Sequence, residues 1–83
     1  MDSTKITQQL KNIIEQYVED KSLLDDIHSN TDLIADLQVN SIHLVDIILD
    51  VEEAFDIEID DDEAEQMISV GNAVSIIANK INA

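Results

Sequence analysis

Residues that break regular backbone structure are almost absent from this chain, whose 83 residues include no Pro and a single Gly, Gly71. Strands joined by tight turns need such residues, so a β-rich fold is disfavoured. Apolar residues instead recur at the three- and four-residue spacing of helix faces. They make up 45% of the chain, which is enough for a packed core and argues against disorder. The sequence therefore predicts an all-α fold.

The first predicted helix follows a cap at Ser3 or Thr4 and is expected to end near residues 19–21. Its apolar face consists of Ile6, Leu10, Ile13, Ile14 and Tyr17. A second helix is predicted from Asn40 or Ser41 to about Phe55, because Asn is a good N-cap.

Residues 22–40 are rich in Ser, Asn, Asp and Thr and are predicted to form a long loop. Nineteen residues is long for a bare connection, and such loops are often functional or contain a helical turn. Its apolar residues are expected to hold the loop against the core: Leu23, Leu24, Ile27, Leu33, Ile34 and Leu37.

The last third of the chain predicts a short helix at residues 61–67 and a final helix that Ser69 caps and that runs through Ile81. The inward face of the final helix should consist of Val70, Val74, Ile77 and Ile81. We therefore expect one domain over residues 1–83, a four-helix bundle with a short third helix and a long loop between helices one and two.

Charge restricts the partners, because 19 Asp and Glu face only four Lys and Arg, for a formal net charge of −15. Such a surface repels nucleic acid and attracts proteins with basic patches. No apolar run is long enough to span a membrane, and no secretion signal is evident, so we expect a cytoplasmic protein. The absence of Cys excludes disulfides and thiolate metal sites.

The second predicted helix carries two apolar faces. Its core face consists of Leu44, Ile47, Ile48, Val51 and Phe55, and its second stripe of Ile42, Val45 and Leu49. The second stripe is bordered by Asp46, Glu52 and Glu53, which suits docking of an enzyme with an apolar groove and basic residues around it. Alternatively, Val45 and Leu49 pack under the long loop.

The residues around this helix start resemble the acyl carrier protein family. The family has an Asp-Ser-Leu tripeptide at the start of its second helix and a Glu-Glu-x-Phe block near that helix's end. The corresponding residues here are Asn40-Ser41-Ile42 and Glu52-Glu53-Ala54-Phe55. The acidic run at residues 61–65 is also similar, and the resemblance extends over residues 6–81.

The resemblance implies that a phosphopantetheinyl transferase attaches 4'-phosphopantetheine to Ser41, taking it from coenzyme A. The chain would then carry acyl groups as thioesters in fatty acid, polyketide or lipid synthesis. Three departures point to a specialised member: Asn40 replaces the Asp that helps the usual transferase, Gln38 stands where Gly is common, and His43 replaces an acidic residue. Asn40 is therefore expected to contact partners together with the exposed stripe.

No enzymatic activity is predicted for Ser41 itself. A nucleophilic Ser needs a base within reach, and His43, two residues further along a helix, does not share its face. Acids alternate at residues 56–60 as in a calcium loop, but Asp61 and Met67 stand where that loop needs Gly and Glu. We therefore predict no metal site.

Two other functions remain open from the sequence. An aminoacyl or peptidyl carrier, including a D-alanyl carrier, shares the modified Ser but is usually less acidic along the second helix. An acidic adaptor would leave Ser41 unmodified. No dimer interface is evident in the sequence, and we expect a monomer.

Overall fold

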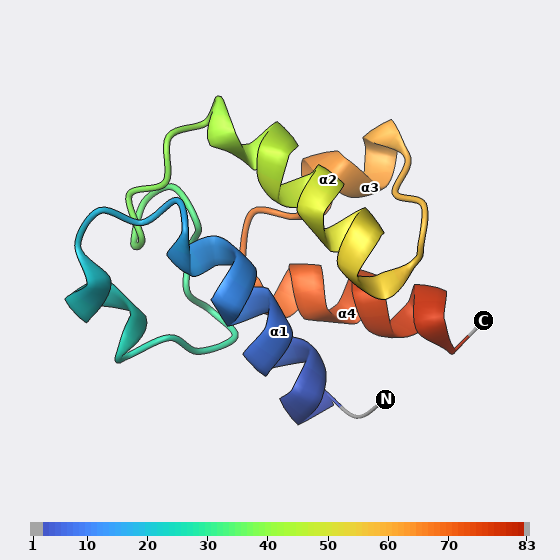
Figure 1. Cartoon of the computed structure of the whole chain (residues 1–83), viewed down its shortest axis with the longest axis horizontal. Helices are drawn as coiled ribbons and strands as arrows, with labels where there is room; N and C mark the ends of the chain where they lie inside the picture. The colour runs from blue at the N-terminus through green and yellow to red at the C-terminus, as the bar shows by residue number, and fades with distance from the viewer. Residues whose placement is uncertain (1–2, 83) are drawn as a thin grey trace.

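The structure, a computed structural model that describes residues 3–82, is helical (Figure 1). Its elements in chain order are α1 (Ser3–Glu15), the 3₁₀ helix η1 (Lys21–Leu24), α2 (His43–Phe55), α3 (Asp61–Gln66) and α4 (Val70–Ile81). The only β-type pairing among the described residues is an isolated bridge between Asp32 and Ser69. The predicted all-α bundle, with its short third helix and long first loop, is confirmed.

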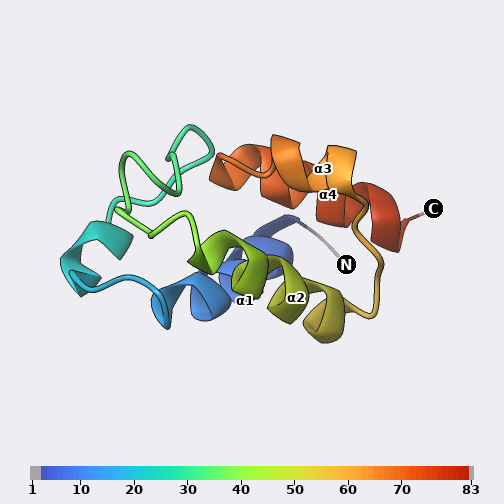
Figure 2. The same cartoon turned by 90° about the horizontal axis from the view of Figure 1, so that it is seen from above.

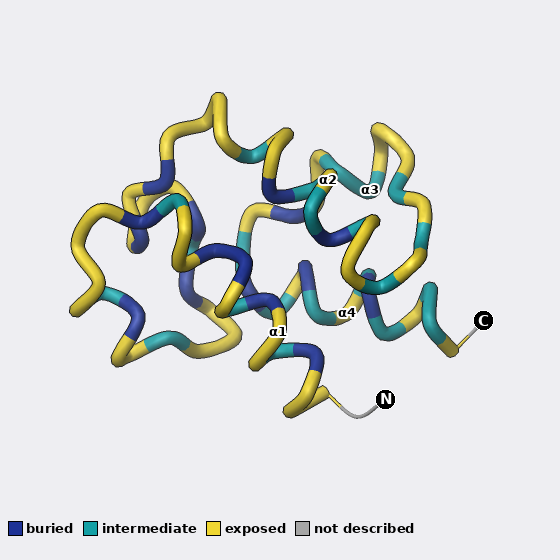
Figure 3. Tube along the Cα trace, in the orientation of Figure 1, coloured by how far each residue is buried: buried dark blue, intermediate teal, exposed yellow. Residues whose placement is uncertain are grey.

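Helix α1 packs against both α2 and α4, and α3 packs on α4. Seen from above, α1 and α2 lie on one side and α3 and α4 on the other, with the long loop at one end (Figure 2). The trace coloured by burial shows the buried positions turned toward the space between the helices (Figure 3). One apolar cluster fills that space, and its members come from all four helices or their ends and from the loop.

Helix α1 ends at Glu15, so the expected end near residues 19–21 was wrong. Successive N–H groups after Glu15 bond to carbonyls only three residues back, from Gln16, Tyr17 and Val18, and this tightens and closes the helix. The ammonium of Lys21 then donates to the carbonyls of Glu15 and Val18, which favours a helix C-terminus.

The start of α1 also differs from the prediction. Ser3 and Thr4 both lie inside the helix, where the Thr7 hydroxyl donates a 2.7 Å hydrogen bond to the Ser3 carbonyl. Neither residue is therefore the cap, and the residue before Ser3 lies outside the described range.

Regular helix begins in α2 at His43, two to three residues later than predicted. The Asn40 side-chain oxygen accepts from Ile42 N at 3.0 Å, as a capping group does. However, His43 N and Leu44 N bond to carbonyls three residues back, those of Asn40 and Ser41. A tight 3₁₀-type turn thus precedes the α-helix, as is common at helix starts.

The long loop is held in place by hydrogen bonds, in which its carbonyls accept from the N–H groups at the start of α4. The N–H groups of Val70 and Gly71 donate to the carbonyls of Thr31 and Ser29 at 2.9 and 2.8 Å, and Asn72 N donates to the Ser69 hydroxyl at 3.2 Å. Three of the donors that a helix start leaves without intrahelical acceptors are thereby satisfied. The predicted Ser69 cap is confirmed.

Most of the predicted loop anchors are confirmed: Leu24, Leu33 and Leu37 are buried, and Leu23 and Ile27 pack on the core. The prediction that Ile34 holds the loop against the core was wrong, because 41% of this residue is exposed. The Asp32 carboxylate accepts from the N–H groups of residues 34 and 35, and the Asp36 and Leu37 N–H groups donate to the Asp32 carbonyl. This helix-like turn puts Leu33 and Leu37 on one face and turns Ile34 outward.

Helix α3 begins with a capping box, in which the Asp60 side chain accepts from Glu63 N and the Glu63 side chain accepts from Asp60 N. An ion pair of 2.7 Å between Glu63 and Lys80 joins α3 to α4.

None of the helices in the described part of the chain is long and apolar enough to cross a membrane.

Candidate functional site

Ser41 lies in the tight turn that leads into α2, and its side chain is exposed. Within residues 3–82 its hydroxyl makes no hydrogen bond, while its carbonyl accepts from Leu44 N at 3.2 Å. The neighbouring N–H groups of Ile42 and His43 are bonded to Asn40. The backbone is therefore held firmly while the hydroxyl stays accessible, which fits the covalent attachment of a large group.

Neither histidine is placed to activate this hydroxyl. The His43 ring lies 5.4 Å from the Tyr17 ring, centroid to centroid, and its Nδ1 lies 3.5 Å from Asp46. In the loop, His28 Nδ1 accepts from Asn30 N at 3.1 Å. Ser41 therefore lacks the paired base that a nucleophilic serine requires.

The second stripe of α2 is exposed, as predicted. The exposed fractions are 74% for Ile42, 60% for Val45 and 56% for Leu49. The alternative in which Val45 and Leu49 pack under the long loop is therefore wrong. Apolar side chains this exposed on one helix face, directly after Ser41, are typical of a surface that another protein covers.

The three predicted acidic border residues differ in their surroundings. Glu53 is exposed, and the side chain of Asp46 is 53% exposed beside His43. Glu52 is half-buried, and its carboxylate accepts from Ile59 N at 2.8 Å, which fastens the connection between α2 and α3. Asp46 and Glu53 are thus free to attract a basic partner, whereas Glu52 also has a structural role.

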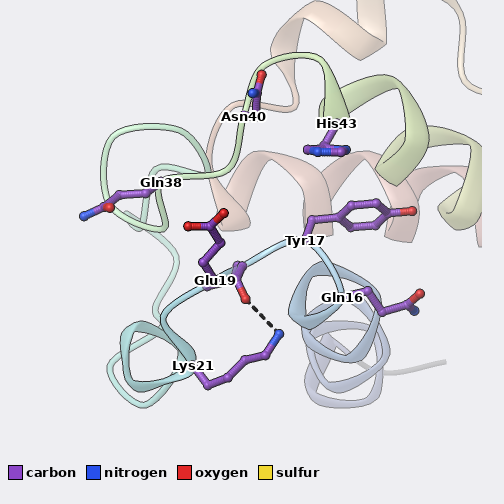
Figure 4. A pocket seen from close by; sticks show the side chains of 8 residues that line it. Gln16, Tyr17, Glu19, Lys21, Gln38, Asn40 and His43 are labelled. Atoms are coloured by element: carbon purple, nitrogen blue, oxygen red, sulfur yellow. Dashed lines mark hydrogen bonds between the residues drawn. The ribbon is translucent and has the colours of Figure 1, made fainter.

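A groove of about 510 Å³ opens between the end of α1 and the start of α2, and Asn40 and His43 are among the residues that line it. Figure 4 shows the Tyr17 ring under His43, with Asn40, Gln38, Glu19 and Lys21 to the left of the ring and Gln16 below it. The groove was missed in the sequence, because its lining residues come from three separate segments that only the loop path brings together.

Tyr17 ties this region together. Its hydroxyl donates a 2.6 Å hydrogen bond to Asp50 Oδ2. That hydrogen bond, partial burial and the negative charges of Asp50 and Asp46 raise the pKa of Tyr17 from 10.0 to about 12. The sequence placed Tyr17 only on the apolar face of the first helix, and nothing in it indicated the link to Asp50.

The acidic segment after α2 does not gather a metal site. Among residues 3–82 no group of three or more His, Asp or Glu side chains is arranged to hold a metal ion. The carboxylates at residues 56–60 are instead distributed along an exposed connection in which Asp60 serves as the cap of α3.

Comparisons with known proteins agree with this geometry. The family model of the phosphopantetheine attachment site matches residues 8–77. Among solved structures, the acyl carrier protein from Enterococcus faecalis matches with 28% sequence identity and a TM-score of 0.79, over 96% of this chain and 99% of that one. Comparison with curated protein sequences gave no significant match.

The family match covers most of the chain, and the structural match extends over nearly all of it. Members of this family are carriers rather than enzymes, and they hold 4'-phosphopantetheine covalently. The predicted resemblance is confirmed. The chain belongs to the phosphopantetheine attachment site family and has the fold of an acyl carrier protein.

Proposed function

We propose that Ser41 carries the 4'-phosphopantetheine and that the chain, as one carrier domain over residues 1–83, presents acyl groups to enzymes of fatty acid, polyketide or lipid synthesis. The main support is the exposed hydroxyl of Ser41, which makes no hydrogen bond within residues 3–82 and lies in the turn before α2, next to an exposed apolar stripe. When bound, the prosthetic group supplies a thiol that holds acyl groups as thioesters.

The chain's own contribution is to fix and expose the attachment point. Asn40 holds the turn through its side-chain oxygen and its carbonyl. A phosphate on Ser41 would lie at the positive end of the α2 dipole, where an anion is favoured. The dipole of α2 would therefore favour a negatively charged linkage at Ser41 even though the protein is acidic.

Asn40 makes transferase choice testable. Loading rates are compared for the native chain and Asn40→Asp, each with a housekeeping and with a broad-specificity phosphopantetheinyl transferase. We expect Asn40→Asp to speed loading by the housekeeping enzyme and to change the broad-specificity rate little. Equal rates for both chains with both enzymes would remove the case for a specialised carrier.

We propose that partner enzymes dock on the stripe of Ile42, Val45 and Leu49, steered by Asp46 and Glu53. The apolar side chains supply area to bury, and the carboxylates attract Arg and Lys at long range. Glu52 and Asn40 border the same surface, so a partner can also contact them.

The docking proposal is tested with Val45→Ser/Leu49→Ser, measuring helicity, melting and transferase loading. We expect native helicity and a drop in loading of at least about tenfold, since two exposed contacts are lost at about 1 kcal/mol or more each. Ile68→Ser is the matched control, because Ile68 is 48% exposed but lies outside α2. Native loading by the double variant would contradict the proposal.

The class of cargo is tested by offering the loaded protein to acyl-activating and to aminoacyl-activating enzymes. We expect acyl transfer, in line with the similarity to an acyl carrier protein. Transfer of amino acids alone would make it an aminoacyl carrier. We also propose that the carrier is cytoplasmic and acts as a monomer. Light scattering tests the oligomeric state.

A further inference from the structure

His43 is the first residue of α2, and its side chain is held in contact with an acid of the docking surface without being buried. The side chain is 46% exposed, and its Nδ1 lies 3.5 Å from Asp46 Oδ2. The ring lies over the Tyr17 ring, with the two centroids 5.4 Å apart (Figure 4). The imidazole is therefore fixed beside Asp46 while solvent still reaches it.

Asp46 lies between His43 and the apolar stripe around α2. Successive residues of an α-helix are rotated by about 100°, which puts Asp46 next to Val45 and Leu49 on one side and next to His43 on the other. A basic side chain of an enzyme seated on the stripe and the His43 ring therefore approach the same carboxylate from opposite sides.

The charge of the His43 ring decides what such an enzyme meets. Imidazole is the ordinary side chain that changes charge between about pH 5 and pH 8. A neutral ring leaves the negative charge of Asp46 uncompensated. A protonated ring pairs with Asp46 and also puts a positive charge two residues from Ser41, so it weakens the attraction of a basic enzyme in both ways.

The other groups around His43 keep their charge over this range. The Tyr17 phenol, whose pKa is raised to about 12, stays neutral, and its hydroxyl is bonded to Asp50. Glu19 and Lys21 line the same groove as His43, and the Lys21 ammonium donates to two backbone carbonyls. Carboxylates and ammonium groups ordinarily stay charged near neutral pH, and the remaining lining side chains are uncharged.

We propose that His43 determines how strongly enzymes dock, because its neutral ring leaves the Asp46 carboxylate to an enzyme's Arg or Lys and its protonated ring occupies that carboxylate. The inference rests on the proposed function, in which basic enzymes dock on the stripe and act at Ser41. His43 is then a specificity-determining residue that acts through Asp46, and docking weakens as the pH falls.

The kinetics of loading by a broad-specificity phosphopantetheinyl transferase test this role. KM and kcat are measured for the native apo protein and for His43→Gln, whose side chain stays neutral. Dividing the native values by the variant values at each pH cancels the titration of the transferase itself. We expect the KM ratio to be about threefold higher near pH 6 than near pH 8, with an unchanged kcat ratio. A KM ratio that does not vary with pH would overturn the proposal.

Two further variants exclude a purely structural effect at position 43. His43→Lys carries a permanent charge and should show the high KM of the acidic range at every pH. His28→Gln is the control, because His28 is the other His of the chain and its Nδ1 accepts from Asn30 N in the loop. It should keep the native pH profile, and loss of that profile in His28→Gln would place the titrating group outside α2.

The route through Asp46 is tested by comparison with Glu53, an exposed acid two turns further along α2. Asp46→Asn should raise KM at every pH and remove most of the pH dependence. Glu53→Gln should also raise KM but keep the pH dependence, because no His lies beside it in the described part of the chain. An undiminished pH dependence in Asp46→Asn would contradict the inference.

These outcomes separate the two proposals. A folded protein that gains no phosphopantetheine unit at any pH overturns the function proposed for Ser41. A protein that is loaded on Ser41 with the same pH profile as His43→Gln overturns only the role of His43.

Discussion

The hydroxyl of Tyr17 donates a 2.6 Å hydrogen bond to Asp50 Oδ2, which ties the turn after α1 to the middle of α2. The same ring lies against His43, two residues after Ser41. Tyr17 thus links the turn after α1 to the segment that holds the proposed attachment point.

This link predicts a specific pH dependence. The pKa of Tyr17 is raised from 10.0 to about 12 in the folded protein, so the neutral phenol is favoured by folding. Its contribution to stability should be complete below pH 10 and be lost as the pH rises to about 12. Tyr17→Phe should be less stable at neutral pH and should lack this loss.

The titration is measured by tyrosinate absorbance, which reports Tyr17 alone because the chain has one Tyr. Denaturant unfolding of both proteins over the same pH range gives the stability difference, and Lys deprotonation cancels because it is common to both. A Tyr17 pKa near 10.0 would show that the bond to Asp50 does not persist in solution.

Gly71 should not tolerate a side chain. A Cβ there would lie 2.8 Å from the Ser29 carbonyl oxygen and 3.0 Å from Ser29 Cβ, where the long loop docks on α4. Gly71→Ala should therefore lower the free energy of unfolding by about 1–3 kcal/mol.

The direction of the stability change makes the Gly71 test informative, because a change from Gly to Ala inside an ordinary helix raises the free energy of unfolding by about 0.5–1 kcal/mol. Ser75→Ala, at an exposed position of α4, is the control and should change little. Thermal and denaturant melts compare the variants, and a gain in stability for Gly71→Ala would mean that the loop is not docked there.

Gln38 adopts a left-handed backbone conformation with φ of 58°. A non-glycine residue in this region costs about 1–2 kcal/mol relative to its usual conformations. Gln38→Gly should therefore raise the melting temperature. Gln38→Ala keeps the strain and removes the side chain, so an equal gain in both variants would point away from the backbone.

Asp56 closes α2 with φ of 54° and brings a negative charge to the helix C-terminus, whose dipole end is also negative. Asp56→Asn should stabilise by about 0.3–1 kcal/mol by removing that charge. Asp56→Gly should stabilise more, because Gly adopts this conformation without strain. Chemical denaturation orders the three proteins, and a native protein more stable than Asp56→Asn would refute the electrostatic part.

Crowded acids should make stability depend on salt, because 11 of the 19 Asp and Glu lie between Asp46 and Glu65. Repulsion among them opposes folding, and cations screen it. Adding millimolar magnesium or lowering the pH mildly should raise the melting temperature. A melting curve indifferent to magnesium, sodium chloride and pH alike would show that the repulsion is negligible.

The helices were predictable because periodic apolar positions report which face is buried. Ile6, Leu10 and Ile77 are fully buried as predicted. Buried residues outside clear periodicity were missed, including Val39, Met67 and Ala73. The end of α1 at Glu15 and the start of α2 at His43 are set by hydrogen bonds between residues three apart, and composition does not reveal these bonds.

The candidate site was likewise predictable from the sequence only in part. The exposed positions of Ile42, Val45 and Leu49 follow from helix geometry once one face is assigned to the core. The groove lined by Asn40 and His43 depends on the path of the long loop, which is held by hydrogen bonds from Gly71 and Val70. Such contacts between distant segments leave no local pattern in a single sequence.

The central claim is that Ser41 carries the prosthetic group, and intact-protein mass spectrometry tests it most directly. The apo protein, Ser41→Ala and the control Ser75→Ala are incubated with coenzyme A and a broad-specificity phosphopantetheinyl transferase. We predict the gain of one phosphopantetheine unit by the native protein and by Ser75→Ala, and no gain by Ser41→Ala. Modification of Ser41→Ala, or no modification of a folded native chain, would contradict the account.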